Sequence, residues 1–513
     1  MQKKSIFQAC TPLFLMQWGC TPQWVTTESP NFASIESNDS DTNSNPDPSD
    51  TEDPLPPLVS IDVRAEYFLG ETIQFDASAT YDPQNLDLTF EWQCSNGSTG
   101  TDKILEIPAQ EEGNIDCTLE VTSEIDLTST ASASTKIMPP PEEAIWTVMV
   151  YIAGDNNLED AGLEDINEME MVGSTNNVNI LVEFDRSRDY SNADGNWYGA
   201  RRFYIRRDSD FNRITSPVME DLGRVDSGDA QTIADFARWG IQHYPAQKYA
   251  LIMWNHGWSW SLNTQSILTK GISSDDETGN DISIADGELT TLLQSVYDLT
   301  GERIELFGMD ACIMQSWEIA HITYPFANFY VASQDYEDWD GWNYTDSLQD
   351  LVNNPTMDGS AFGTVITQRF FETDDATLSA LDLSQLPDFE SSLDSFAQEI
   401  MEANQSSQVY DAANASYSYD GSGWGEDHDV WGLAEYFKIH GSNTNLQNAA
   451  EDVQVSLQNL VISNKVQEWV SDAHGLNIYS PPQRNWGISQ SYLDASWSED
   501  TLWDELLWSS YSQ

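Results

Sequence analysis

The sequence predicts an α/β layered fold with a largely parallel central sheet flanked by helices, preceded by a small all-β sandwich. From residue 142 onward, short apolar runs alternate with stretches of helical spacing, which is typical of parallel strands joined by helices. Between residues 58 and 138, short runs of alternating polarity are separated by turn residues, as in β-sandwiches. The chain has 513 residues, enough for more than one domain.

The composition limits the classes of partner. There are 85 acidic and 21 basic side chains, which give a net charge of −64. We expect no nucleic-acid binding, because phosphate recognition needs clustered Lys and Arg. The acidity favours solubility and would attract basic polypeptides at long range. No subunit partner is indicated, and we expect a monomer.

Residues 1–20 have the features of an export signal. Lys3 and Lys4 precede a mostly apolar run over residues 6–18, which is too short to span a bilayer. Gly19-Cys20 resembles the cleavage site of bacterial lipoproteins, whose Cys becomes lipidated, although Gln17 stands where Leu is usual. We expect an exported protein that is either secreted or attached to the cell surface through a lipid on Cys20. That anchor would be its one contact with a membrane.

Residues 21–57 are dominated by Ser, Thr, Asp, Asn and Pro, and such a segment buries too little surface to offset its chain entropy. We predict a disordered acidic linker. The sandwich, residues 58–138, follows, and Pro139-Pro140-Pro141 ends it. Its strands are predicted at residues 59–63, 72–78, 88–94, 103–108, 117–123 and 129–137.

The sandwich segment resembles the immunoglobulin-like domain named after polycystic kidney disease protein, through GETIQFDASATYDP, LTFEWQ and CTLEVTSEIDLTS. In that family the strand that contains LTFEWQ and the strand that contains CTLEVTS face each other across the core. Cys94 and Cys117 lie on them, so the resemblance implies a disulfide in an exported protein, worth roughly 3 kcal/mol. Two reduced buried cysteines are the alternative.

The large block, residues 142–513, carries the α/β pattern. Its helices are predicted at residues 229–244, with Asp229 as N-cap, 283–299 and 313–324. Buried strands are predicted at residues 145–153, 178–185, 249–257, 304–312 and 329–335.

Two of these strands end in reactive groups. One ends in His256-Gly257 and another in Cys312. Reactive groups gather at the carboxyl ends of parallel strands, so adjacent strands would bring His256 to the Cys312 thiol, a nucleophile that a nearby His can assist. The amides of Gly257 and Cys312 could then hold an oxyanion. Each residue alone is more often structural, so the residues by themselves leave both interpretations open.

The block resembles the clostripain family of cysteine peptidases. The resemblance rests on WTVMVYIAGDNNLE (146–159), YALIMWNHGWSW (249–260), ELFGMDACIMQSWEIA (305–320) and VASQDYEDWDGWNY (331–344). It implies a caspase-like fold, a catalytic dyad of His256 and Cys312, and cleavage after Arg or Lys.

That specificity needs a buried anion, because a guanidinium pairs best with a carboxylate. Asp310 is one candidate. In residues 333–344 the first choice is Asp340, followed by Asp335 and Asp338. This segment has Gln-Asp where the family commonly has Glu-Glu, and it lacks Pro-Gly, so the pocket acid stays open.

The loop after His256 contains one basic residue, Lys270, and family members are often matured by a cut between the His and Cys segments. We therefore predict autocleavage after Lys270. No metal motif occurs and no cofactor is required by the sequence. Calcium, which some family members need, remains an option for the Asp-rich runs at 273–281 and 420–429.

The sequence thus predicts an exported cysteine endopeptidase that cleaves protein or peptide substrates after Arg or Lys. The main alternative is a non-catalytic binding or adhesion protein at the cell surface with an inactive peptidase-like fold. A peptidase with non-basic specificity is a second alternative, if the pocket acid is absent.

Overall fold

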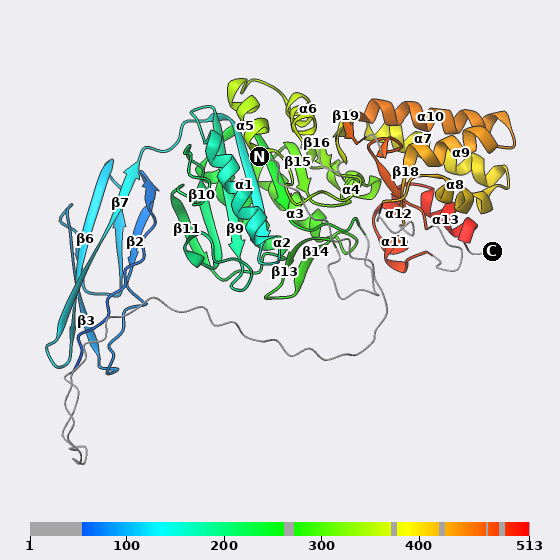
Figure 1. Cartoon of the computed structure of the whole chain (residues 1–513). Coiled ribbons are helices and arrows are strands. Elements are labelled where there is room, and N and C mark those ends of the chain that lie inside the picture. Colours follow the sequence, from blue (N-terminus) through cyan, green and yellow to red (C-terminus); the bar gives the residue numbers. More distant parts are fainter. Residues whose placement is uncertain are drawn as a thin grey trace, which may run out of the picture. The chain divides into compact units, whose positions relative to one another are not determined.

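A computed structural model describes residues 54–260, 271–370, 377–419, 426–467, 470–481 and 488–511 (Figure 1). The chain divides into two units, Met1–Pro54 and Leu55–Gln513. The predicted export signal, Cys20, most of the linker and Lys270 lie outside the described residues. Among the residues that are described, no helix combines the length and apolar character needed to cross a membrane.

The first strands form an all-β sandwich. In the described part, one sheet has the order β1-β7-β6-β3-β4, and β2 pairs with β5. Alternate residues are buried, so Phe75, Trp92 and Leu119 lie in one core. The strands are β1 (Glu66–Phe68), β2 (Thr72–Asp76), β3 (Leu88–Cys94), β4 (Thr99–Gly100), β5 (Ile104–Pro108), β6 (Gly113–Ser123) and β7 (Thr128–Met138).

Cys94 and Cys117 form a disulfide, but the expected arrangement of their strands was wrong. β3 and β6 do not face each other across the core. They are antiparallel neighbours in one sheet, and Cys94 lies directly opposite Cys117. The physical reason is the alternation, because it turns Trp92 and Cys94 on β3, and Cys117 and Leu119 on β6, toward the same core.

The second sheet has nine strands within the described residues, in the order β11-β10-β9-β8-β12-β15-β16-β17-β19 (Figure 1). The strands from β9 to β16 are parallel, and the outer ones are antiparallel. This confirms the predicted α/β fold. The strands are β8 (Ala144–Gly154), β9 (Val178–Arg186), β10 (Gly199–Tyr204), β11 (Val218–Gly223), β12 (Ala246–Trp254), β15 (Ile304–Asp310), β16 (Ala327–Ala332), β17 (Thr377–Asp382) and β19 (Val461–Val466).

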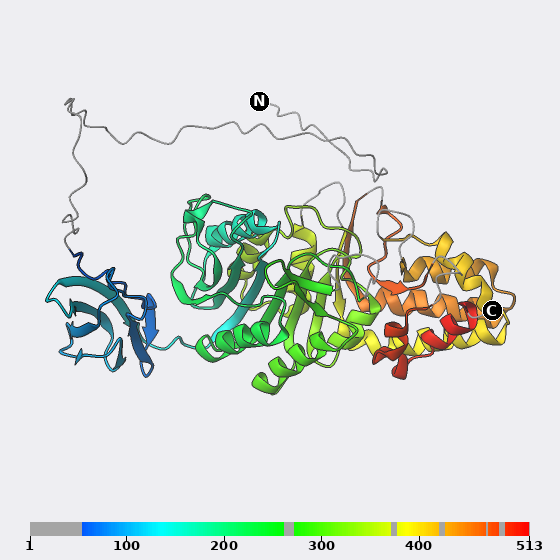
Figure 2. The same ribbon diagram turned by 90° about the horizontal axis from the view of Figure 1, so that it is seen from below.

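Helices cover both faces of this sheet (Figure 2). Val148 and Val150 of β8 face one core with helices α1, α5 and α6, whereas Met149 and Tyr151 face the other with α2, α3 and α4. Two-sided burial explains why β8 is continuously apolar. These helices are α1 (Glu159–Val172), α2 (Ala230–His243), α3 (Glu288–Thr300), α4 (Trp317–Thr323), α5 (Tyr344–Asn353) and α6 (Gly359–Arg369).

The second core continues into a C-terminal helical region. Its helices are α7 (Leu386–Glu402), α8 (Val409–Ala415), α9 (Val430–His440), α10 (Thr444–Leu460), α11 (Gln490–Asp494), α12 (Trp497–Asp500) and α13 (Trp503–Tyr511). Two short antiparallel pairs also occur, namely β13 (Gly271–Asp275) with β14 (Asn280–Ser283), and β18 (Asp427–Asp429) with β20 (Asn477–Tyr479).

Several helices and strands begin or end at other residues than the sequence predicts. Asp229 caps α2, because its side chain accepts a hydrogen bond from the amide of Gln231. However, α4 begins at Trp317 rather than at residue 313, with Ser316 as its N-cap. The strand predicted at 304–312 ends at Asp310. The segment around Cys312 is therefore a turn between β15 and α4.

Candidate active site

His256 and Cys312 lie at the same edge of the central sheet. β12 and β15 are parallel neighbours, and their last paired residues are Trp254 and Asp310. His256 comes two residues after Trp254, and Cys312 comes two residues after Asp310. The structure thus places both side chains at adjacent carboxyl ends of the sheet, as reactive groups in α/β folds commonly are.

The turn that carries Cys312 is strained and closely packed. Ile313 has a φ of +57°, which a β-branched residue rarely adopts, and its amide donates to Asp335 O at 3.0 Å. A Cβ at Gly257 would collide with the carbonyl oxygen of Cys312. Gly257 is therefore what allows the His loop and the Cys loop to touch. Such strain is often found at functional sites.

His256 is held by two asparagines. Its Nε2 lies 2.9 Å from Asn157 Oδ1, and its backbone amide donates to Asn255 Oδ1. Because Oδ1 only accepts, the imidazole proton lies on Nε2 and Nδ1 is left as the basic nitrogen. Burial lowers the pKa of His256, which keeps the ring neutral at neutral pH.

The Cys312 thiol is held by the loop after β16. Its Sγ accepts a hydrogen bond from the Glu337 amide at 3.3 Å and lies 3.8 Å from the Glu337 carbonyl oxygen. Burial raises the pKa of the thiol to about 11, and the charges of Asp335 and Asp310 add to this. At neutral pH the Cys312 thiol is therefore protonated and the His256 ring is neutral.

The two amides predicted to hold an oxyanion remain available. In the described part of the chain, neither Gly257 nor Cys312 donates its backbone amide to another residue. Both belong to loops that meet directly, since Gly257 packs against the Cys312 carbonyl. The pair can hold the oxygen of a carbonyl attacked by the thiol.

The predicted pocket acids differ in burial. Asp310 is 3% exposed, and its Oδ2 accepts hydrogen bonds from Tyr344 OH at 2.8 Å and Trp342 N at 3.4 Å. Asp335 is also buried, but its Oδ1 accepts the amide of Tyr336 at 2.8 Å. Asp338 and Asp340 are exposed, which disagrees with the buried anion expected at the first-choice position.

Sequence reasoning missed Glu337. Its carboxyl group is hydrogen-bonded to that of Asp310 beside the nucleophile. One signal could have indicated it, since Glu337 is the only Glu in residues 333–344 and lies within a segment that the family resemblance already singled out.

Two acids of α1 lie close to this pair. Asp165 is 5% exposed and accepts the Trp254 indole at 2.6 Å. Glu168 accepts the Tyr344 amide at 3.0 Å, and burial raises its pKa to about 7. They are three residues apart in the sequence, so both lie on one face of α1.

Aromatic residues share a small hydrophobic cluster with Cys312. The cluster is built on Ile313, Tyr419 and Ala473, and Cys312, Tyr336 and Tyr417 pack against it. The ring of Tyr336 also contacts that of Trp258, which lies two residues after His256, with 6.3 Å between the ring centroids.

A separate acidic cluster lies at the ends of β8, β9 and β13. Asp155, Asp185 and Asp275 are all buried and each offers an oxygen, with these atoms within 4.8 Å of one another. The adjacent Arg186 does not neutralise them, because its Nε donates to Glu159 Oε1 at 2.6 Å. Burial and the neighbouring carboxylates raise the pKa of Asp185 to about 8. Such a donor set fits calcium, which prefers oxygen ligands.

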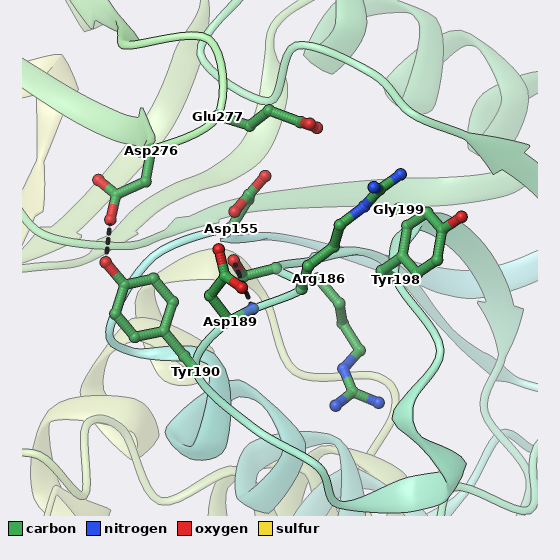
Figure 3. A pocket seen from close by; sticks show the side chains of 10 residues that line it. Asp155, Arg186, Asp189, Tyr190, Tyr198, Gly199, Asp276 and Glu277 are labelled. Atoms are coloured by element: carbon green, nitrogen blue, oxygen red, sulfur yellow. Dashed lines mark hydrogen bonds between the residues drawn. The ribbon is translucent and has the colours of Figure 1, made fainter.

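A cavity of about 330 Å³ opens beside this cluster. Figure 3 shows Asp155, Asp276 and Glu277 around it, with Tyr190 hydrogen-bonded to Asp276. The second Asp-rich run of the sequence, 420–429, is described only from residue 426, so residues 420–425 lie outside the described part.

A His and a Cys at adjacent carboxyl ends of a parallel sheet covered by helices define the class of caspase-like cysteine-peptidase folds. The family model of the clostripain family matches residues 150–509, and the chain belongs to this family.

Relatives agree with this assignment. Clostripain from Hathewaya histolytica is 29% identical over 189 residues, which are 34% of this chain and 35% of that protein. The match thus spans about a third of that relative's length.

Two solved structures share the fold. A secreted C11 cysteine protease from Bacteroides thetaiotaomicron, in complex with an irreversible peptide inhibitor, has a TM-score of 0.51 and 19% identity and covers 69% of this chain and 100% of its own. An inactive zymogen C11 protease from Parabacteroides distasonis has a TM-score of 0.53 and 20% identity, with coverages of 70% and 99%.

Proposed function

We propose that this protein is a cysteine endopeptidase in which Cys312 is the nucleophile and His256 transfers protons. The observation that carries the proposal is the strand register, because Trp254 pairs with Asp310 and thereby brings His256 and Cys312 to one edge in a member of a peptidase family.

The reaction starts from the neutral dyad. As Cys312 Sγ attacks the substrate carbonyl carbon, His256 Nδ1 takes the thiol proton, and the amides of Gly257 and Cys312 hold the oxyanion. The imidazolium then gives its proton to the leaving amine. The amine departs, and an acyl-enzyme remains. Water, deprotonated by His256, then attacks the thioester carbon. The C–S bond breaks, the acid product leaves, and the Cys312 sulfur takes back the proton from the imidazolium. Asn157 keeps the ring oriented through Nε2.

Specificity for Arg or Lys belongs to the same proposal. It is supported by the buried carboxyl group of Asp310, two residues before Cys312, and by the rings of Tyr336 and Tyr417, which pack against the same cluster as Cys312 and would suit the aliphatic stem of a long basic side chain. Proteins and peptides rich in basic residues are therefore the proposed substrates.

Export and maturation are part of the proposal as well. The disulfide between Cys94 and Cys117 supports export, because disulfides persist in oxidising compartments. A secreted protein or a lipoprotein anchored through Cys20 both fit. Autocleavage after Lys270 is tested by mass spectrometry of the wild type, Lys270→Ala and Cys312→Ala, and a wild-type chain that stays intact while active would overturn it.

We also propose that Asp155, Asp185 and Asp275 hold calcium, which would neutralise the cluster near the His256 loop. The test is the melting temperature of the inactive Cys312→Ala protein with and without CaCl₂. Calcium should raise it. Asp185→Asn should abolish the increase, whereas the exposed control Asp298→Asn should keep it. A melting temperature that does not respond to calcium would contradict the site.

The activity itself is tested on fluorogenic peptides ending in Arg, Lys, Asp, Asn or Leu. We expect hydrolysis after Arg and Lys by the wild type and none by Cys312→Ala. Equal signals from both proteins would refute the thiol mechanism and favour a binding protein. Hydrolysis mainly after Leu or Asp would keep the peptidase and remove the basic pocket.

A further inference from the structure

Two carboxyl groups meet directly beside the nucleophile. Glu337 reaches Cys312 with its backbone, since its amide lies 3.3 Å from Sγ. Its side chain extends to Asp310, and the two carboxyl groups are hydrogen-bonded to each other. Two ionised carboxylates have no hydrogen to share, so this contact requires one proton between them.

The groups around the pair are acidic or neutral. Asp165 and Glu168 face it from α1, and Tyr344 faces it from α5, where its hydroxyl donates to Asp310. Cys312 and the indole of Trp342 complete the surroundings on the loop side. Among the described residues, no Lys, Arg or His forms an ion pair with either acid of the pair.

The Glu337 carboxyl group is buried between polar neighbours. Its Oε1 is shielded from solvent, and the indole of Trp342 lies within hydrogen-bonding reach of the carboxyl group and favours its ionised form. An indole N–H is neutral, so it does not compensate the charge of two carboxylates.

We propose that Glu337 is a specificity-determining residue, and that it forms with Asp310 a site for the cationic side chain of the substrate in which this cation replaces the proton the two carboxyl groups share. The inference rests on the proposed function, because it names how the same site recognises Arg or Lys.

The charges balance in this exchange. Before binding, the pair holds one proton and carries one negative charge. When Arg binds, the proton leaves to solvent, and both carboxylates face the guanidinium, whose fork can hydrogen-bond each of them. A neutral side chain cannot replace the proton. The pair therefore disfavours substrates with a neutral side chain at this site and favours substrates with a cationic one.

This exchange makes recognition dependent on pH. Burial raises the pKa of Asp310 to about 6 and raises that of Glu337 well above its usual range. Displacing the shared proton is harder at lower pH, so the affinity for Arg peptides should increase with pH as long as the pair still holds that proton. The affinity for a neutral analogue should not change in this way.

The test uses the full-length Cys312→Ala protein, which binds without cleaving. A peptide ending in Arg and its citrulline analogue, which is neutral and has nearly the same shape, are titrated by calorimetry at pH 7 in buffers of different ionisation enthalpy. We expect about one proton to be released per bound Arg peptide and none with citrulline. In the double variant Cys312→Ala/Glu337→Gln, the proton release should vanish. The ratio of the affinities for the Arg and citrulline peptides should fall about tenfold.

The exposed Glu302→Gln is the matched control and should behave like the parent protein. A clear preference for Arg with no proton release overturns this inference and leaves the basic specificity standing. Equal binding of Arg and citrulline overturns the basic pocket itself. If Glu337→Gln does not fold, the proton count on the parent protein decides the matter alone.

Discussion

The Nε2 atom of His256 lies 2.9 Å from Oδ1 of Asn157, so an asparagine at the end of β8 orients a histidine at the end of β12. The two residues come from adjacent strands of the sheet. Their contact fixes the tautomer of the ring and leaves Nδ1 as its basic nitrogen, and its removal should therefore affect the proposed proton transfer more than substrate binding.

Replacing Asn157 by Ala should lower kcat about tenfold, the equivalent of about 1.4 kcal/mol, because the ring loses its preferred tautomer and orientation. KM should stay near the wild-type value. Asn157→Asp should instead shift the acid limb of the pH–rate profile to higher pH, since a carboxylate favours the imidazolium. A rise in KM alone, with unchanged pH profiles, would contradict a positioning role.

The thiol should react slowly with alkylating agents. Because burial raises the pKa of Cys312 to about 11, iodoacetamide at pH 7 should modify it about 300-fold more slowly than free cysteine. The rate should rise about tenfold per pH unit toward pH 11 and can be followed by mass spectrometry. A rate that levels off below pH 9 would indicate a preformed thiolate–imidazolium pair instead.

Replacing Gly257 by Ala should abolish activity, because the new methyl group collides with the Cys312 carbonyl oxygen and separates the two loops. We expect a loss of at least about 100-fold in kcat/KM, comparable to the loss of an oxyanion donor. Gly287→Ala is the control. Its left-handed backbone is strained by the substitution, but no atom lies nearby, so stability should fall by about 1 kcal/mol without an effect on kcat.

The disulfide should stabilise the sandwich and leave catalysis unaffected. Cys94 and Cys117 are separated by 23 residues, and replacing both with Ala should lower the free energy of unfolding by roughly 3 kcal/mol. Hydrogen exchange, followed by mass spectrometry on peptides from residues 58–138, measures this. Reduced wild-type protein should resemble the variant, and equal stabilities of the oxidised and reduced forms would contradict the expectation.

The sequence predicted the central strands because burial on both faces leaves continuous apolar runs such as residues 145–153. It predicted His256 and Cys312 because both directly follow such runs. It could not choose the buried acid of residues 333–344, where four carboxylates lie close together and the turn geometry alone decides that Glu337 points inward while Asp340 stays in solvent.

The acidic cluster could not be found from the sequence either. Asp155, Asp185 and Asp275 follow or end three different strands, and only the strand order brings them together. The relation of Cys94 to Cys117 was misjudged for a similar reason, since alternation shows which face a residue occupies but not which strand lies beside it.

The pairing of β12 with β15 has a consequence for a chain cut within residues 261–270. Such a cut would leave His256 on one polypeptide and Cys312 on the other. The sheet would still run without interruption through both pieces, with β8, β9 and β12 from the first and β15 and β16 from the second. The two products would behave as a single folded body held by strand hydrogen bonds and two shared cores, and would come apart only when the protein is denatured.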